Sequence, residues 1–149
     1  MNNNHLTKDE KFNGSYYNKH SYGENTENLT LSLKSDGTSN LLHYISDKTD
    51  VPDCVSTISE SNTTYSGTYE IESNSGTTYK LKCVFTGKKT DGKFASVDCL
   101  VKENQTKTGK TDEEQVISQT ASFTVDLGNH QVKISAETNF INATDNLRS

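Results

Sequence analysis

Long hydrophobic runs are missing from the sequence, and hydrophobic residues make up only 30% of its 149 positions. No apolar run approaches the roughly 18 residues that a membrane-spanning helix needs, so no transmembrane segment is predicted. Residues 1–10 also lack the apolar core of a signal peptide. Two readings follow. The favoured one is a secreted or surface-anchored chain written without its leader, and the other is a cytoplasmic protein.

Basic residues are too few and too scattered to form a face for nucleic acid. The chain has 15 Lys and Arg against 20 Asp and Glu, with a net charge of −5. Nucleic-acid backbones are usually bound by clustered positive charge, so we expect no nucleic-acid partner.

The scarcity of aliphatic residues brings the composition close to that of disordered chains. Leu, Ile, Val and Phe number 10, 6, 8 and 5. The modest net charge, the 7 Tyr and 5 Phe, and a clear alternation of apolar and polar residues favour a folded domain instead. The 17 Ser and 20 Thr suit strands and turns better than helices.

Alternation is clearest in two neighbouring runs. In residues 77–87 the odd positions from Tyr79 to Phe85 are apolar, and in residues 93–102 those from Ala95 to Val101 are apolar. The turn-rich residues 88–92 separate the two runs. This pattern is typical of two half-buried strands in a hairpin. Folding the chain about the turn places Cys83 opposite Cys99.

A third run precedes this hairpin. Residues 65–72 alternate in the same way and join it through residues 73–76, which would set Tyr69 against Leu81. Because a slip of one residue moves every side chain to the other face, the three matching patterns support one another. They predict a three-stranded antiparallel meander.

Further alternating runs lie on both sides of the meander. Asp36-Gly37 is a hairpin signal, and a turn at residues 128–129 would pair Val125 with Val132. Polar loops are predicted at residues 18–27 and 103–115. Additional strands are predicted at residues 12–17, 28–34, 41–46, 55–59, 117–127 and 132–138.

The predicted fold class is therefore all-β, a single antiparallel meander of eight or nine strands. An up-and-down barrel is favoured over a sandwich. The β domain would span residues 11–141, with a polar N-terminal tether at 1–10 and a polar C-terminal tail at 142–149.

The three cysteines leave the redox state open. Cys83 and Cys99 could form a cross-strand disulfide if their strands pair as predicted. Alternatively, both could be buried thiols, or Cys54 could pair with one of them.

No catalytic or metal-binding motif stands out. The four histidines are scattered, and no Cys or His doublet has zinc-ligand spacing. Residues 87–93 match the start of a phosphate-binding loop, but Phe94 stands where Ser or Thr is needed and the segment is predicted to join two strands. We expect no enzyme activity, no cofactor and no metal site.

Three short motifs resemble those of the bacterial lipocalin-like lipoproteins of the calycin group. They are Gly14-Ser15-Tyr16, the Leu-rich run 29–38 that ends in Asp-Gly-Thr, and residues 67–71, which begin Gly-Thr-Tyr. The resemblance covers about the first half of the chain. It implies a barrel of the lipocalin type at a cell surface, although the first strand lacks that family's tryptophan.

Two functions are consistent with these patterns. In the first, the barrel encloses a small apolar molecule. In the second, the domain binds a protein or glycan partner through the loops at 18–27 and 103–115. For the first function, the same apolar side chains could instead fill the core, which is favoured because apolar residues are scarce. The candidate ligand-lining residues are Tyr16, Leu31, Tyr69, Tyr79, Leu81 and Phe123.

Overall fold

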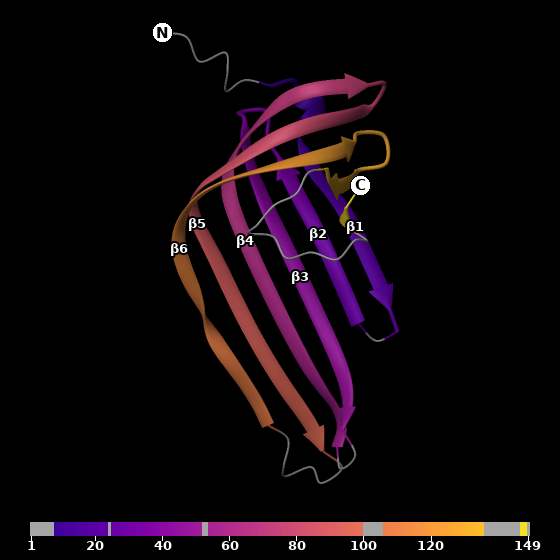
Figure 1. Ribbon diagram of the computed structural model, residues 1–149, viewed down its shortest axis with the longest axis vertical. Helices are drawn as coiled ribbons and strands as arrows, with labels where there is room; N and C mark the ends of the chain where they lie inside the picture. Colours follow the sequence, from indigo (N-terminus) through magenta and orange to yellow (C-terminus); the bar gives the residue numbers. More distant parts are fainter. Residues whose placement is uncertain (1–7, 24, 52–53, 100–105, 136–146, 149) are drawn as a thin grey trace.

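The computed structural model describes residues 8–23, 25–51, 54–99, 106–135 and 147–148, with side chains except at 48–51, 54–61, 87–99 and 106–117. Seven strands, each antiparallel to the next along the chain, form a closed barrel (Figure 1). A short 3-10 helix, η2 (Glu10–Phe12), precedes them. The strands are β1 (Gly14–Tyr22), β2 (Asn25–Leu33), β3 (Thr38–Val51), β4 (Cys54–Ser75), β5 (Thr78–Cys99), β6 (Thr106–Asp126) and β7 (Gln131–Ile134).

The barrel closes through a parallel contact between β1 and β7. In a chain of consecutive antiparallel strands, the first and seventh run in the same direction, so an odd strand count makes this pair parallel. The two strands pair at a single position, Tyr17 opposite Gln131. The Tyr17 N–H also donates a 2.8 Å hydrogen bond to the His130 carbonyl. This narrow contact is the barrel seam.

The four central strands extend beyond the barrel. Pairing of β2 with β3 ends at Thr26 and Ser46, whereas β3 stays paired with β4 as far as Val51 and Cys54. In Figure 1, β3, β4, β5 and β6 accordingly reach past the ends of β1 and β2. The closed barrel therefore continues into an open sheet of β3, β4, β5 and β6. We call this sheet the four-stranded extension.

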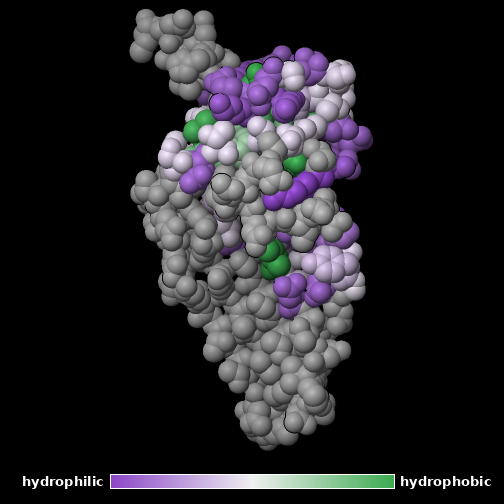
Figure 2. Space-filling model, viewed as in Figure 1, coloured by the Kyte–Doolittle hydropathy of each residue, from purple (hydrophilic) through white to green (hydrophobic). Residues whose placement is uncertain are grey.

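Apolar side chains at alternate strand positions meet inside the barrel. Phe12 adds its ring from η2 and Leu147 adds its side chain from near the C-terminus; they are 2% and 0% exposed. Burial of each large side chain contributes roughly 1.5–3 kcal/mol. On the face drawn in Figure 2, the described surface is mostly hydrophilic, with hydrophobic residues visible only in small separate spots. The strand residues of this core are Tyr16, Leu29, Leu31, Leu33, Leu41, Tyr65, Tyr69, Leu81, Cys83, Phe85, Ala121, Phe123, Val125, Val132 and Ile134.

The predicted all-β barrel is confirmed, but the expected strand count of eight or nine is wrong. The described residues form seven strands, because several predicted elements merge. The predicted strands at 55–59 and 65–72 are parts of one strand, β4. The loops predicted at 18–27 and 103–115 lie largely within strands: β1 continues to Tyr22, and β6 begins at Thr106.

The hairpin predicted over residues 77–102 is also wrong. Residues 88–92 lie in the middle of β5, where β4 and β6 hold them from both sides. Pairing on two sides outweighs the turn preference of a Lys-Thr-Asp-Gly sequence. Cys83 and Cys99 therefore occupy one strand and cannot face each other, so the predicted Cys83–Cys99 disulfide is excluded. Cys83 is a buried free thiol.

The other predicted registers fare better. Val125 pairs with Val132, as expected. Between β4 and β5, Tyr69 lies opposite Cys83 rather than Leu81. The turn falls at residues 76–77 instead of 73–76, and a register irregularity between Ile71 and Ser73 adds to the change. The shift is two residues, so Tyr69 and Leu81 keep their predicted inward faces.

Candidate functional site

The six predicted ligand-lining residues do converge inside the barrel. Five are at most 1% exposed, and Tyr79 is partly buried and packs against the same core. Phe12 fills one end of the group, with its ring centroid 5.0 Å from that of Tyr79 and 6.2 Å from that of Tyr69. The convergence was predicted correctly, but these side chains are packed as core.

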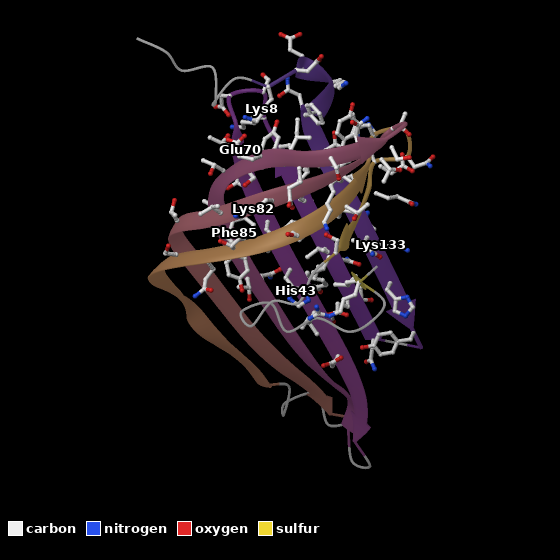
Figure 3. All side chains as sticks on the ribbon, turned by 45° about the horizontal axis from the view of Figure 1, so that its top comes forward. Lys8, His43, Glu70, Lys82, Phe85 and Lys133 are labelled. Atoms are coloured by element: carbon white, nitrogen blue, oxygen red, sulfur yellow. The ribbon has the colours of Figure 1, made fainter. Side chains whose placement is uncertain are left out.

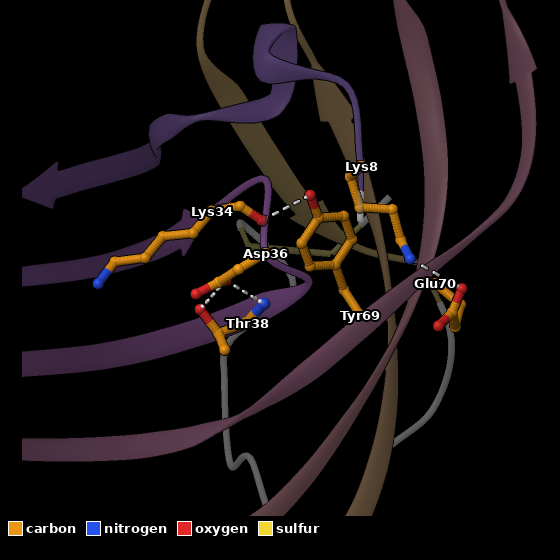
Figure 4. A network of polar contacts seen from close by, with 6 residues as sticks. All are labelled: Lys8, Lys34, Asp36, Thr38, Tyr69 and Glu70. Atoms are coloured by element: carbon orange, nitrogen blue, oxygen red, sulfur yellow. Dashed lines mark hydrogen bonds and ion pairs between the residues drawn. The ribbon is translucent and has the colours of Figure 1, made fainter. Parts of the chain in front are cut away.

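The tyrosine hydroxyls in this group are bonded to the chain itself. The Tyr16 hydroxyl donates to the Phe12 carbonyl at 2.9 Å, and the Tyr69 hydroxyl donates to the Lys34 carbonyl at 3.0 Å. Figure 4 shows the Tyr69 bond beside the ion pair between Lys8 and Glu70, whose N–O distance is 3.2 Å. Burial raises the pKa of both phenols, so they remain protonated donors. These bonds fix the rings in place as structural elements.

One polar pair lies among the buried side chains. Glu27 of β2 and His43 of β3 are 1% and 6% exposed, and the His43 Nε2 lies 2.8 Å from the Glu27 Oε2. They are diagonal neighbours, since Glu27 is directly opposite Ile45. A buried carboxylate needs such a partner to offset its desolvation. Figure 3 labels His43 among the side chains drawn on the ribbon.

Cys83 is predicted to react slowly with alkylating agents in the folded protein. Burial raises the pKa of its thiol to about 12, and its side chain is 0% exposed. Since the thiolate is the reactive form, iodoacetamide at pH 8 should label Cys83 only as fast as the barrel opens. Peptide mass mapping would measure this rate with and without urea. Equal labelling in both conditions would contradict the buried position.

A groove of about 220 Å³ lies on the barrel where β1 and β7 meet. The strands pair there at one position only, which leaves space between them. Tyr17 and Lys19 alternate with buried Tyr16, so they lie on the outer face. The groove residues are Tyr17, Asn18, Lys19, Gln131, Val132 and Lys133. We call this space the seam groove.

The lining of the seam groove combines positive charge with an exposed aromatic ring. Tyr17 is 42% exposed, and the Lys19 Nζ lies 5.1 Å from its ring centroid. Lys133 comes from the opposite strand, β7 (Figure 3). Asn18 and Gln131 bring amide groups that can donate and accept hydrogen bonds. None of the six lining residues is acidic, so the groove favours a negatively charged group.

The polar turn between β6 and β7, next to the seam groove, is held by its own hydrogen bonds. Asp126 accepts hydrogen bonds from the Gly128 and Asn129 N–H groups at 2.8 and 3.2 Å, and from the Asn129 side chain at 2.9 Å. The Asn129 side chain is the main cause that holds the pKa of Asp126 below its ordinary value. His130 stacks on Tyr16 with 5.1 Å between ring centroids. This turn therefore helps to fix the position along β1 at which β7 pairs with it.

Other kinds of site find little support in the described part of the chain. Within it, no group of three or more His, Cys, Asp or Glu side chains could hold a metal ion. Across the same residue ranges, no helix has the length and apolar character of a membrane span. No protein-family model matches the chain, and comparison with curated proteins and with solved structures found no match.

Neither the seam groove nor the buried Glu27–His43 pair was predicted from the sequence. Glu27 could have been found, because it continues the inward alternation of Leu29, Leu31 and Leu33 by one more step. His43 likewise follows Leu41 on the inner face of β3. No local pattern predicts the groove, since it depends on contact between strands more than 100 positions apart.

Proposed function

We propose that this chain is a non-enzymatic binding domain of the cell exterior or cell surface, and that its seam groove holds a negatively charged group of the partner. The observation that carries the proposal is the pair of lysines, Lys19 and Lys133, brought from two strands to one groove that no acidic residue lines. The chain as a whole has a net charge of −5, so the positive charge of the groove is opposite in sign to the net charge of the chain.

The size of the groove limits what it can take. Its 220 Å³ is smaller than the roughly 300–1,000 Å³ of pockets that enclose drug-sized ligands. The groove would therefore accept one residue of a larger partner. The Tyr17 ring offers an apolar surface to a sugar ring, while the amide of Gln131 suits hydroxyl groups. A sugar acid, carrying a carboxylate for the lysines, fits this set best, which favours an acidic glycan as partner.

The enclosed apolar ligand is the less favoured function, because its proposed lining is packed as core. The likeness to lipocalin-like lipoproteins stays a proposal. A closed barrel whose consecutive strands are antiparallel supports it, with the first motif at the start of β1 and the third on β4. The seven strands and the absence of any family match give no further support.

Removing the groove lysines is expected to weaken binding of glucuronate. An exposed ion pair contributes up to about 1 kcal/mol, so Lys19→Ala or Lys133→Ala should each lower the affinity up to about fivefold. The double variant should lose measurable binding. Isothermal titration calorimetry would compare glucuronate, glucose and inorganic phosphate, and the binding should weaken as salt rises.

Lys82→Ala is the matched control, because Lys82 is an exposed lysine of β5 outside the groove. Its affinity should equal that of the unmodified chain. Equal binding of glucose and glucuronate would contradict the role of the lysines, and phosphate binding alone would replace the glycan with a phosphate-bearing partner. An unchanged affinity in the double variant would overturn the proposal.

A further inference from the structure

The structure brings together two cysteines that lie far apart in the sequence. Cys54 begins β4 and Cys99 ends β5, and their backbones are directly paired in the antiparallel ladder. A register irregularity between Cys54 and Ser56 adjusts the ladder at this point, and this adjustment is what brings Cys54 into line with Cys99. Of the three cysteines in the chain, these two are cross-strand neighbours.

Directly opposed positions in antiparallel strands suit a disulfide. Their Cα atoms lie about 4.5 Å apart in a non-hydrogen-bonded pair and about 5.5 Å apart in a hydrogen-bonded pair. Disulfides span Cα separations of roughly 4.4–6.8 Å, so either kind of pair meets the requirement. The backbone register alone therefore satisfies the distance condition.

Cys83 does not compete for this bond. It lies on β5 with Cys99, and at roughly 3.3 Å per residue the path along the strand between them is about 50 Å. In the β4–β5 ladder, Cys83 lies opposite Tyr69, not opposite Cys54. Its thiol is buried within the barrel, and burial raises its pKa. Only one pairing of the three cysteines is compatible with the register.

We propose that Cys54 and Cys99 form a disulfide that joins the ends of β4 and β5. The oxidant would be a disulfide-bearing compound or thiol oxidoreductase of an oxidising compartment. One cysteine thiolate attacks that disulfide, forming a mixed disulfide and releasing one thiol. The second cysteine then displaces the other sulfur. The chain loses two protons and two electrons, one S–S bond forms in it, and the oxidant becomes two thiols.

At this position the disulfide would stabilise the end of the β4–β5 ladder. The β4–β5 ladder ends there in the four-stranded extension, beyond the last pairs that β2 makes with β3. A cross-link at the end of a ladder prevents separation of the two strands from that end. It also restricts the unfolded chain, since the closed loop contains the whole of β4 and β5.

The test uses the full chain refolded in a glutathione redox buffer. Intact mass under non-reducing conditions should be two hydrogens below the reduced mass, and proteolysis should yield a peptide pair linking Cys54 and Cys99. Reduction should lower Tm by about 5–10 °C. The Cys83→Ala variant should keep the mass deficit, and Cys54→Ser and Cys99→Ser should each lose it.

Two results would overturn the proposal. One is three titratable thiols in denaturant after oxidative refolding. The other is a cross-linked peptide that contains Cys83. If Cys54→Ser fails to refold, the peptide map of the unmodified chain decides the question on its own.

Discussion

Replacing Gly67 with alanine is expected to destabilise the barrel by about 3 kcal/mol, near the upper end of the usual cost of overpacking. A Cβ at this position would overlap the Val84 carbonyl oxygen and lie 2.7 Å from the Phe85 Cα. Both contacts are with backbone of the neighbouring strand, so no side chain can rotate away. Urea unfolding followed by circular dichroism would give the change in free energy of unfolding.

The close approach arises from the register of β4 and β5. Pairing jumps from Tyr65 opposite Lys89 to Gly67 opposite Phe85, so β5 has extra residues at this point. Thr64→Ala is the control, because Thr64 is exposed on the same strand. Its effect should stay within about 0.5 kcal/mol. Equal stability of Gly67→Ala and Thr64→Ala would contradict the close packing of the two strands.

Truncating His43 to alanine is expected to have a comparably large effect. It would remove the imidazole whose Nε2 lies 2.8 Å from the carboxyl group of Glu27, a residue only 1% exposed. Loss of one partner from a buried hydrogen bond commonly costs about 1–3 kcal/mol, because the polar group left behind stays desolvated. The free energy of unfolding at pH 7 would measure this loss.

A double substitution tests whether the stability lost in His43→Ala comes from the unmatched polar group of Glu27. Glu27→Leu with His43→Leu removes both polar groups, so it should recover most of the stability that His43→Ala loses. Glu70→Gln serves as the exposed comparison, since Glu70 pairs with Lys8 but its side chain is 59% exposed. That change should cost at most about 1 kcal/mol. A His43→Ala cost equal to that of Glu70→Gln would show that the buried pair contributes little.

Alternation predicted which side chains face inward more reliably than it predicted the turns. The odd positions Leu81, Cys83 and Phe85 are all buried, as are Phe123 and Val125. The inward face survives even a register error of two residues, because the side-chain period in a strand is also two. The core was therefore largely predictable from residue order alone.

Turns were overestimated within the long strand β5. Residues 88–92 contain glycine, threonine and aspartate, which locally favour a turn. In the structure, β4 and β6 pair with this stretch from both sides, and that cooperation between distant segments has no local signal. The same reason explains why two predicted strands on β4 are one and why the count fell from eight or nine to seven.

The candidate site was the least predictable part. The two lysines of the seam groove belong to the first and last strands, and neither lies in a recognisable motif. Their proximity follows from closure of the barrel, which brings β1 and β7 together. The recognition surfaces predicted from sequence were instead the loops at 18–27 and 103–115, most of which pair as strands.

Backbone amide mapping by ¹H–¹⁵N NMR during a glucuronate titration tests the central claim most directly. Binding in the seam groove predicts shifts confined to residues around Tyr17–Lys19 and Gln131–Lys133. Amides of the packed interior, such as those of Leu81 and Phe123, should not move. Shifts that instead centre on these interior residues would contradict the surface groove and place the ligand within the barrel.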